Sequence, residues 1–176
     1  MTEKAVTILE ARPEDAAALR SYMRELVAER LPTLLLRESA RSVDEQAEFL
    51  RQHLDSESRL FLVAKAEGRI VGQLRFVGEA HERCAHGGTI GMSVHESCRG
   101  EGVGTRLLRE LFRWVERHAS ICRVELEVLS NNPRARDLYA RLGFEHEGVR
   151  RGAVRIGREA VDACLMARLW AKKGSA

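Results

Sequence analysis

Three glycines and an arginine stand where the chain could hold a phosphate group. Residues 90–108 read IGMSVHESCRGEGVGTRLL: apolar residues alternate over Ile90, Met92 and Val94, an arginine and three glycines follow, and an amphipathic pattern begins. This order predicts a strand, a glycine loop and a helix. A helix start presents backbone N–H groups without intrahelical partners and the positive end of the helix dipole, and glycines let a ligand approach closely. The spacing therefore predicts a phosphate-binding loop.

Two common phosphate loops do not fit this spacing. The segment has no Gly-Lys-Ser/Thr of a nucleotide P-loop, and glycines at 100, 102 and 104 do not make the dinucleotide pattern Gly-x-Gly-x-x-Gly. The remaining pattern, Arg99 to Gly104 after a strand that ends at Val94, resembles the coenzyme A pyrophosphate loop of the GNAT family of N-acetyltransferases.

The resemblance implies acetyl-coenzyme A as a co-substrate, and it assigns donor-binding positions. The family's arrangement places pantetheine along Met92 and Val94, and it implies a bulge near Val94 whose N–H groups stabilise an oxyanion. The residues expected around the pyrophosphate are Arg99, Gly100, Gly102, Gly104 and Thr105.

A second motif follows at residues 132–144, which read NPRARDLYARLGF and resemble the family's Asn-x-x-Ala-x-x-Leu-Tyr-x-x-x-Gly-Phe at every specified position. Asn132 is a strong helix cap before Pro133, and Gly143 suits a left-handed helix end. Asn132 fits both a cap and a cofactor contact. Tyr139 fits a half-buried packing position, but the resemblance implies a general acid that protonates the departing thiolate, as a phenol can at neutral pH.

The resemblance also implies a general base, because an ammonium group is not nucleophilic. Glu127 is the candidate, since some peptide N-terminal acetyltransferases of the family have a glutamate at the matching strand position. A salt-bridged surface role fits Glu127 equally well. Glu125, Glu79 and His86 are its competitors.

Patterns elsewhere predict elements that would position these residues. A strand over 124–128, reached through a helix, must lie parallel to the strand ending at Val94, and diverging parallel neighbours leave a cleft for pantetheine. Glu67 to Arg69 suits a hairpin turn. Further strands are expected at 5–9, 60–64, 70–76 and 160–169, and helices beginning near residues 12, 43 and 132. With the resemblance, this predicts an α+β fold with a mixed, splayed sheet of six or seven strands and about four helices.

Composition excludes several classes. The 176 residues, 44% of them hydrophobic and 31% charged, predict one domain over 1–176 without a membrane span or a signal peptide. A net charge of +3 without a long basic block disfavours nucleic acid. The four cysteines are widely spaced, which favours a reduced cytoplasmic setting over a disulfide framework. Two of them stand with three histidines between residues 81 and 98, but the spacing matches no standard metal pattern, so no metal is expected.

The sequence therefore predicts an N-acetyltransferase that moves an acetyl group directly to a primary amine of a small molecule or a protein N-terminus. A non-catalytic acyl-coenzyme A sensor is the main alternative, and a structural dimerisation domain is a third. The C-terminal part, with Arg150-Arg151 and residues 165–168, resembles the branch of ribosomal-protein alanine and small-amine acetyltransferases. Leu34 to Leu36 could overlie the acceptor site or pack in the core, and the C-terminal strands are compatible with a homodimer. The sequence does not distinguish among these acceptor amines.

Overall fold

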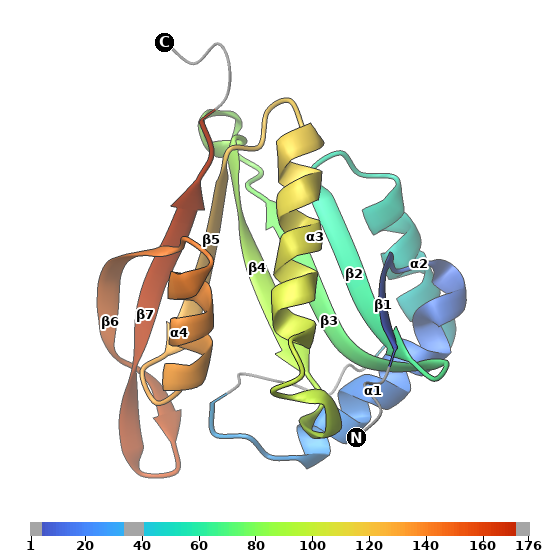
Figure 1. The fold of residues 1–176 in the computed structure, drawn as a ribbon, viewed down its shortest axis with the longest axis horizontal. Helices are drawn as coiled ribbons and strands as arrows, with labels where there is room; N and C mark the ends of the chain where they lie inside the picture. Colours follow the sequence, from blue (N-terminus) through green and yellow to red (C-terminus); the bar gives the residue numbers. More distant parts are fainter. Residues whose placement is uncertain (1–4, 34–40, 172–176) are drawn as a thin grey trace.

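A computed structural model describes residues 5–33 and 41–171, and its centre is one seven-stranded mixed sheet in the order β1-β2-β3-β4-β5-β7-β6 (Figure 1). The strands are β1 (Val6–Glu10), β2 (Arg59–Ala66), β3 (Arg69–Gly78), β4 (Gly87–Val94), β5 (Arg123–Leu129), β6 (Glu145–Ile156) and β7 (Glu159–Leu169). The helices are α1 (Ala16–Ala28), α2 (Val43–Leu54), α3 (Val103–Arg117) and α4 (Pro133–Arg141), with short 3-10 turns at Pro13–Asp15, Glu82–Cys84 and Glu96–Cys98.

Helices cover both faces of the sheet (Figure 1). The apolar stripe of α3, which includes Leu107, Leu111 and Val115, is buried in the larger core with side chains of β2 to β5. On the other face α1 and α2 bury a smaller cluster that includes Leu26, Leu50 and the side chains that β2 and β3 turn toward them. The alternation of the strands thus divides the apolar residues between two cores.

The strands β4 and β5 separate along their length. They run parallel and pair only over Gly87–Thr89 and Arg123–Glu125, and the register carries no pair beyond these residues. Figure 1 shows the two strands diverging from their paired end, with α3 beside β4 and α4 beside β5. The sheet therefore opens between its fourth and fifth strands, as the sequence predicted.

Most predicted elements are confirmed within one or two residues. The hairpin turn has Glu67 at φ 51° and Gly68 at φ 76°, and α2 begins at Val43 as predicted. The expected bulge near Val94 was wrong: β4 pairs with β3 without a register shift from Gly88 to Val94. Leu34 to Leu36 lie outside the described residues.

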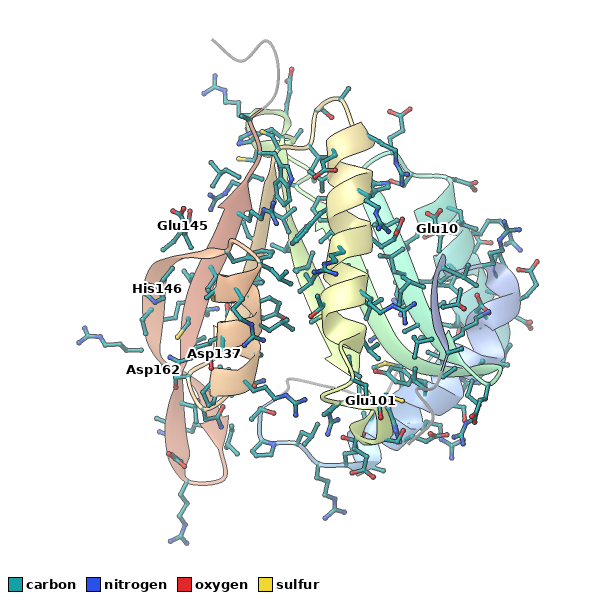
Figure 2. All side chains as sticks on the ribbon, viewed as in Figure 1. Glu10, Glu101, Asp137, Glu145, His146 and Asp162 are labelled. Carbon is teal, nitrogen blue, oxygen red and sulfur yellow. The ribbon has the colours of Figure 1, made fainter. Side chains whose placement is uncertain are left out.

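The sheet ends in two edge strands, β1 and β6. The outer strand β6 carries polar side chains, including Glu145 and His146 (Figure 2), which discourage edge-to-edge pairing. In the described part of the chain no helix is long and apolar enough to cross a membrane.

Candidate active site

A cavity of about 1160 Å³ lies where β4 and β5 separate, and it reaches both faces of the sheet. The walls come from α1, the segment after it, α2, the middle of β3, the end of β4, the glycine loop, β5 and α4. All ten site residues predicted from the sequence line this cavity: Met92, Val94, Arg99, Gly100, Gly102, Gly104, Thr105, Glu127, Asn132 and Tyr139.

The glycine loop takes a conformation that its glycines make possible. Gly100 has φ 91° and Gly102, the cap residue of α3, has φ 78°, both in the left-handed region that L side chains rarely adopt. A Cβ at Gly104 would lie 3.2 Å from a Leu138 methyl carbon and 3.3 Å from Met92 Cε. Glu101, the acid of the loop, is exposed near the start of α3 (Figure 2). The backbone of the loop therefore faces the cavity at a helix N-terminus, which suits a phosphate group.

Arg99 fastens this loop to its surroundings. Its Nε donates to Val94 O at 2.9 Å, and its Nη2 pairs with Glu29, which follows α1. Glu29 also accepts from the backbone N–H of Glu96 at 3.2 Å. The guanidinium is thus engaged by α1 and β4, so Arg99 positions the loop, and a contact with pyrophosphate stays a prediction.

The free edge of β4 presents polar backbone groups to the cavity. His95 N donates to Val71 O on β3 at 2.9 Å, and antiparallel pairing alternates along a strand. The amides of Met92 and Val94 consequently face away from β3, toward the opening left by β5. These are the two positions at which an extended ligand could pair as a missing strand would.

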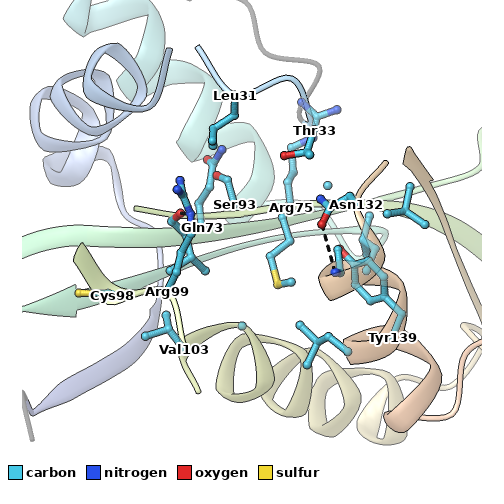
Figure 3. Close-up of a pocket in the computed structure, with 18 of the residues that line it drawn as sticks. Leu31, Thr33, Gln73, Arg75, Ser93, Cys98, Arg99, Val103, Asn132 and Tyr139 are labelled. Carbon is cyan, nitrogen blue, oxygen red and sulfur yellow. Dashed lines mark hydrogen bonds between the residues drawn. The ribbon is translucent and has the colours of Figure 1, made fainter. Parts of the chain in front are cut away.

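The second motif forms α4 as its caps predicted. Asn132 Oδ1 accepts from Ala135 N at 3.1 Å, the hydrogen bond drawn in Figure 3. Gly143, just beyond the helix, has φ 84°. Asn132 therefore caps the helix with its amide oxygen while it also lines the cavity.

Tyr139 is more deeply buried than the half-buried packing position that was the alternative to a catalytic role. Its side chain is 7% exposed, and it makes an edge contact with Phe144 at 5.6 Å between ring centroids. Burial raises the pKa of Tyr139 to about 12, because the charged phenolate loses its hydration. The phenol therefore keeps its proton at neutral pH, which an acid catalyst requires.

Glu127 reaches the cavity from β5. Its carboxylate accepts a hydrogen bond from Arg150 Nη1 at 2.6 Å, and its side chain is 33% exposed. The competing candidates do not line the cavity: Glu125 pairs with Arg123 Nε at 2.7 Å, and Glu79 and His86 are exposed near the paired ends of the strands. Glu127 thus forms a salt bridge with Arg150 and also lines the cavity.

Other cavity residues were not singled out from the sequence. Arg134 on α4 has Nη2 3.2 Å from where a Cβ of Gly100 would lie, so it brings positive charge to the glycine loop. The sequence signal that could have identified Arg134 was its position within the second motif. Ser93 shares a 2.9 Å hydrogen bond with the buried Tyr22 of α1, and Gln73 and Arg75 of β3 face the same side (Figure 3). These three lie in ordinary strand patterns that gave no signal.

No cluster of three or more His, Cys, Asp or Glu side chains suited to a metal ion occurs among residues 5–33 and 41–171. The histidines and cysteines between residues 81 and 98 therefore form no such cluster in the described structure.

The fold and the cavity belong to a known class. The model of the acetyltransferase (GNAT) family matches residues 11–144, and the chain belongs to this family. An L-amino acid N-acetyltransferase of Escherichia coli K12, AaaT, is 35% identical over 109 residues, which cover 61% of this chain and 67% of the relative. The chain is accordingly an acetyl-coenzyme A-dependent N-acetyltransferase.

Solved structures show the same architecture. A GNAT-family acetyltransferase of Streptococcus pneumoniae superposes with a TM-score of 0.89 at 26% identity, covering 95% of this chain and 100% of that one. The yncA protein of Salmonella typhimurium, solved with its cofactor acetyl-CoA, gives a TM-score of 0.83 at 18% identity over 98% and 97% of the two chains. A ribosomal-protein-alanine N-acetyltransferase of Brucella melitensis gives 0.78 at 22% identity over 93% and 99%. Because their identities are below 25%, the similarity to the last two structures shows a common fold alone.

Proposed function

We propose that this enzyme transfers the acetyl group of acetyl-coenzyme A directly to a primary amine, of a small molecule or a protein N-terminus, with Tyr139 as general acid and Glu127 as general base. The observation that carries the proposal is the separation of β4 and β5. Because these strands separate, Tyr139 of α4 and Glu127 of β5 both line one cavity, beside the unpaired edge of β4.

The donor would lie along the motif residues. Backbone N–H groups at Gly100, Gly102 and Gly104, with Thr105 at the helix start, would hold the pyrophosphate, and Arg134 would add charge. Pantetheine would lie along Met92 and Val94 and pair with the outward amide of Met92, close to Asn132 across the opening.

The reaction needs both a base and an acid, because the acceptor nitrogen loses two protons and the thiolate gains one. Glu127, directly or through a water molecule, would take a proton from the acceptor ammonium, and the amine nitrogen would then attack the thioester carbon. The tetrahedral oxyanion would be stabilised by the outward N–H of Val94, which pantetheine would leave free. When the C–S bond breaks, the Tyr139 hydroxyl would donate its proton to the thiolate. The nitrogen would lose its second proton, which would return through water to the Tyr139 phenolate, and the acetylated amine would then leave.

A covalent enzyme intermediate is not part of this scheme. Cys98 lines the cavity, but its side chain is 1% exposed and packs in the larger core. A thiol in that position has no open path to a thioester carbon, so direct attack by the amine is the simpler route.

The name of the Escherichia coli relative supports a small-molecule amine as acceptor. The four free cysteines support the predicted cytoplasmic setting.

The test combines binding and turnover in one sample. Purified protein is titrated calorimetrically with acetyl-coenzyme A, and free-thiol release is then followed with a panel of amino acids, other small amines and short peptides with free N-termini. Binding with thiol release that depends on an amine is the expected result. Binding without release for every amine would instead support the sensor alternative, and no binding would contradict the donor site.

A further inference from the structure

A row of residues crosses the sheet on the face that α1 and α2 cover. Arg75 of β3 pairs with Phe61 of β2 on one side and with Gly91 of β4 on the other. Gly91 and Glu127 each lie two residues beyond the last β4–β5 pair, Thr89 with Glu125, so they face each other across the opening. No atom lies within 4 Å of a Cβ built on Gly91. Arg75 and Glu127 therefore lie on opposite sides of an unfilled space next to Gly91.

Arg75 lies among positive charges. Its guanidinium carbon is 5.9 Å from the ring centroid of Phe49, and that of Arg41 is 4.1 Å from the same ring. Arg75 is exposed to the cavity, and the pKa of its guanidinium is lowered by partial loss of hydration and then by the charges of Arg41 and Arg59. In the described residues no carboxylate forms an ion pair with Arg75. An anion beside it would offset both the lost hydration and the repulsion.

The segment after α1 crosses this part of the cavity. Asn131 Nδ2, from the corner between β5 and α4, donates to Pro32 O at 3.2 Å, and Leu31 and Thr33 line the cavity beside it. Figure 1 shows the segment passing below the opening of the sheet, and Figure 3 shows Leu31 and Thr33 above Arg75 and Ser93. Such a cover limits the space that a long peptide needs and suits a small acceptor.

We infer that Arg75 binds a carboxylate of the acceptor, so that the enzyme acetylates a free amino acid whose ammonium group lies at Glu127. This assignment of substrate class rests on the proposed function. Strands two apart lie about 10 Å from each other where a sheet is paired, and β3 and β5 lie farther apart beyond Thr89 and Glu125, where β4 and β5 have separated. The long arginine side chain spans part of this gap and leaves room for one small molecule. Arg75 is thus a specificity residue, with Phe49 and Arg41 beside it.

The experiment compares each L-amino acid with its own amide, which keeps the amine and removes the negative charge. Initial rates of thiol release are measured for wild type, Arg75→Gln and Arg59→Gln. Arg59 is the matched control, because it is a neighbouring positive charge that does not line the cavity. The wild type should prefer the acids. Arg75→Gln should lower kcat/KM for acids about 10- to 100-fold, mainly through KM, and change the amides less than about threefold.

A binding measurement keeps the inference testable if turnover fails. Thermal shifts with the same acids and amides, in the presence of coenzyme A, should show stabilisation by an acid in the wild type and in Arg59→Gln and its loss in Arg75→Gln. That result without turnover would support the carboxylate site and contradict the proposed function. Turnover of acids and amides alike, unchanged in Arg75→Gln, would overturn the inference and leave the proposed function standing. Absence of both binding and discrimination would overturn the inference as well.

Discussion

The two halves of the cavity are built differently. The donor half, formed by the end of β4, the glycine loop and α4, consists of backbone groups and of side chains within two short motifs. The acceptor half takes single side chains from α1, the segment after it, α2 and β3, which lie far apart in the sequence. The donor half is therefore expected to be insensitive to which amine is used, whereas changes in the acceptor half should alter some substrates and spare others.

The largest effect should come from Tyr139, which acts on every acceptor alike. Tyr139→Phe removes the proposed proton donor and keeps the ring against Phe144, so kcat should fall about 10²- to 10⁴-fold with acetyl-coenzyme A affinity nearly unchanged. Steady-state kinetics and calorimetry measure the two quantities. Tyr22→Phe is the control, because Tyr22 also has a buried hydroxyl but does not line the cavity. Wild-type rates in Tyr139→Phe would exclude the acid role.

Glu127 should follow, with an effect that again does not depend on the acceptor side chain. Glu127→Gln keeps the size of the side chain and removes its basicity, and kcat should fall about 10²-fold at neutral pH. The loss should shrink as pH rises toward the pKa of the amine, because free amine then becomes abundant. Glu125→Gln on the same face of β5 should leave the pH profile unchanged. If both variants behaved alike, Glu127 would be a surface salt-bridge residue.

The glycine loop should show a moderate effect confined to the donor. Gly102→Ala places a side chain at φ 78° where no atom lies within 4 Å, so its cost is backbone strain of about 1–2 kcal/mol. Gly68→Ala in the β2–β3 turn adds the same kind of strain at φ 76°, also in open space and outside the cavity. Both variants should lose similar stability in denaturant titrations, but only Gly102→Ala should weaken acetyl-coenzyme A binding, by about tenfold. Equal affinities would exclude a phosphate contact at the loop.

The effect that is least visible at neutral pH concerns stability at high pH. Tyr139 has a folded-state pKa of about 12, above the unfolded value near 10, so its stabilising contribution is complete below about pH 10 and is lost as pH rises through about pH 12. The full difference of about two pKa units corresponds to about 3 kcal/mol. The free energy of unfolding should therefore fall less steeply over this range in Tyr139→Phe than in the wild type. Parallel curves would indicate that the phenol ionises freely in the folded protein.

The donor half could be predicted because its requirements are local. A left-handed glycine, a helix cap and a helix start are each set by neighbours in the sequence, so the loop and α4 follow from short patterns. The opening of the sheet followed from the strand order and the family resemblance. The predicted bulge near Val94 failed because the divergence of β5 already frees the edge of β4, and regular pairing with β3 is kept.

The acceptor half could not be predicted because its contacts are distant in sequence. In the sequence, Arg75 has the pattern of an ordinary outward-facing strand residue. Its proposed role in acceptor binding depends on Gly91 beside it and on Phe49 from α2. Arg99 is 70 positions from Glu29, so no local pattern shows that its guanidinium is already bound. The full burial of Tyr139 likewise depends on its contact with Phe144, which lies beyond the end of α4.

The most direct test of the account asks whether the amine attacks a bound thioester in one ternary complex. Enzyme in stoichiometric amount is mixed rapidly with acetyl-coenzyme A, first alone and then with the best amine from the panel, while free thiol and acetylated enzyme are followed. Direct transfer predicts no thiol release until the amine is present, then release matched by acetylated amine, with no acetyl group on the protein. Stoichiometric thiol release without amine, with acetyl transferred to a side chain such as Cys98, would contradict it.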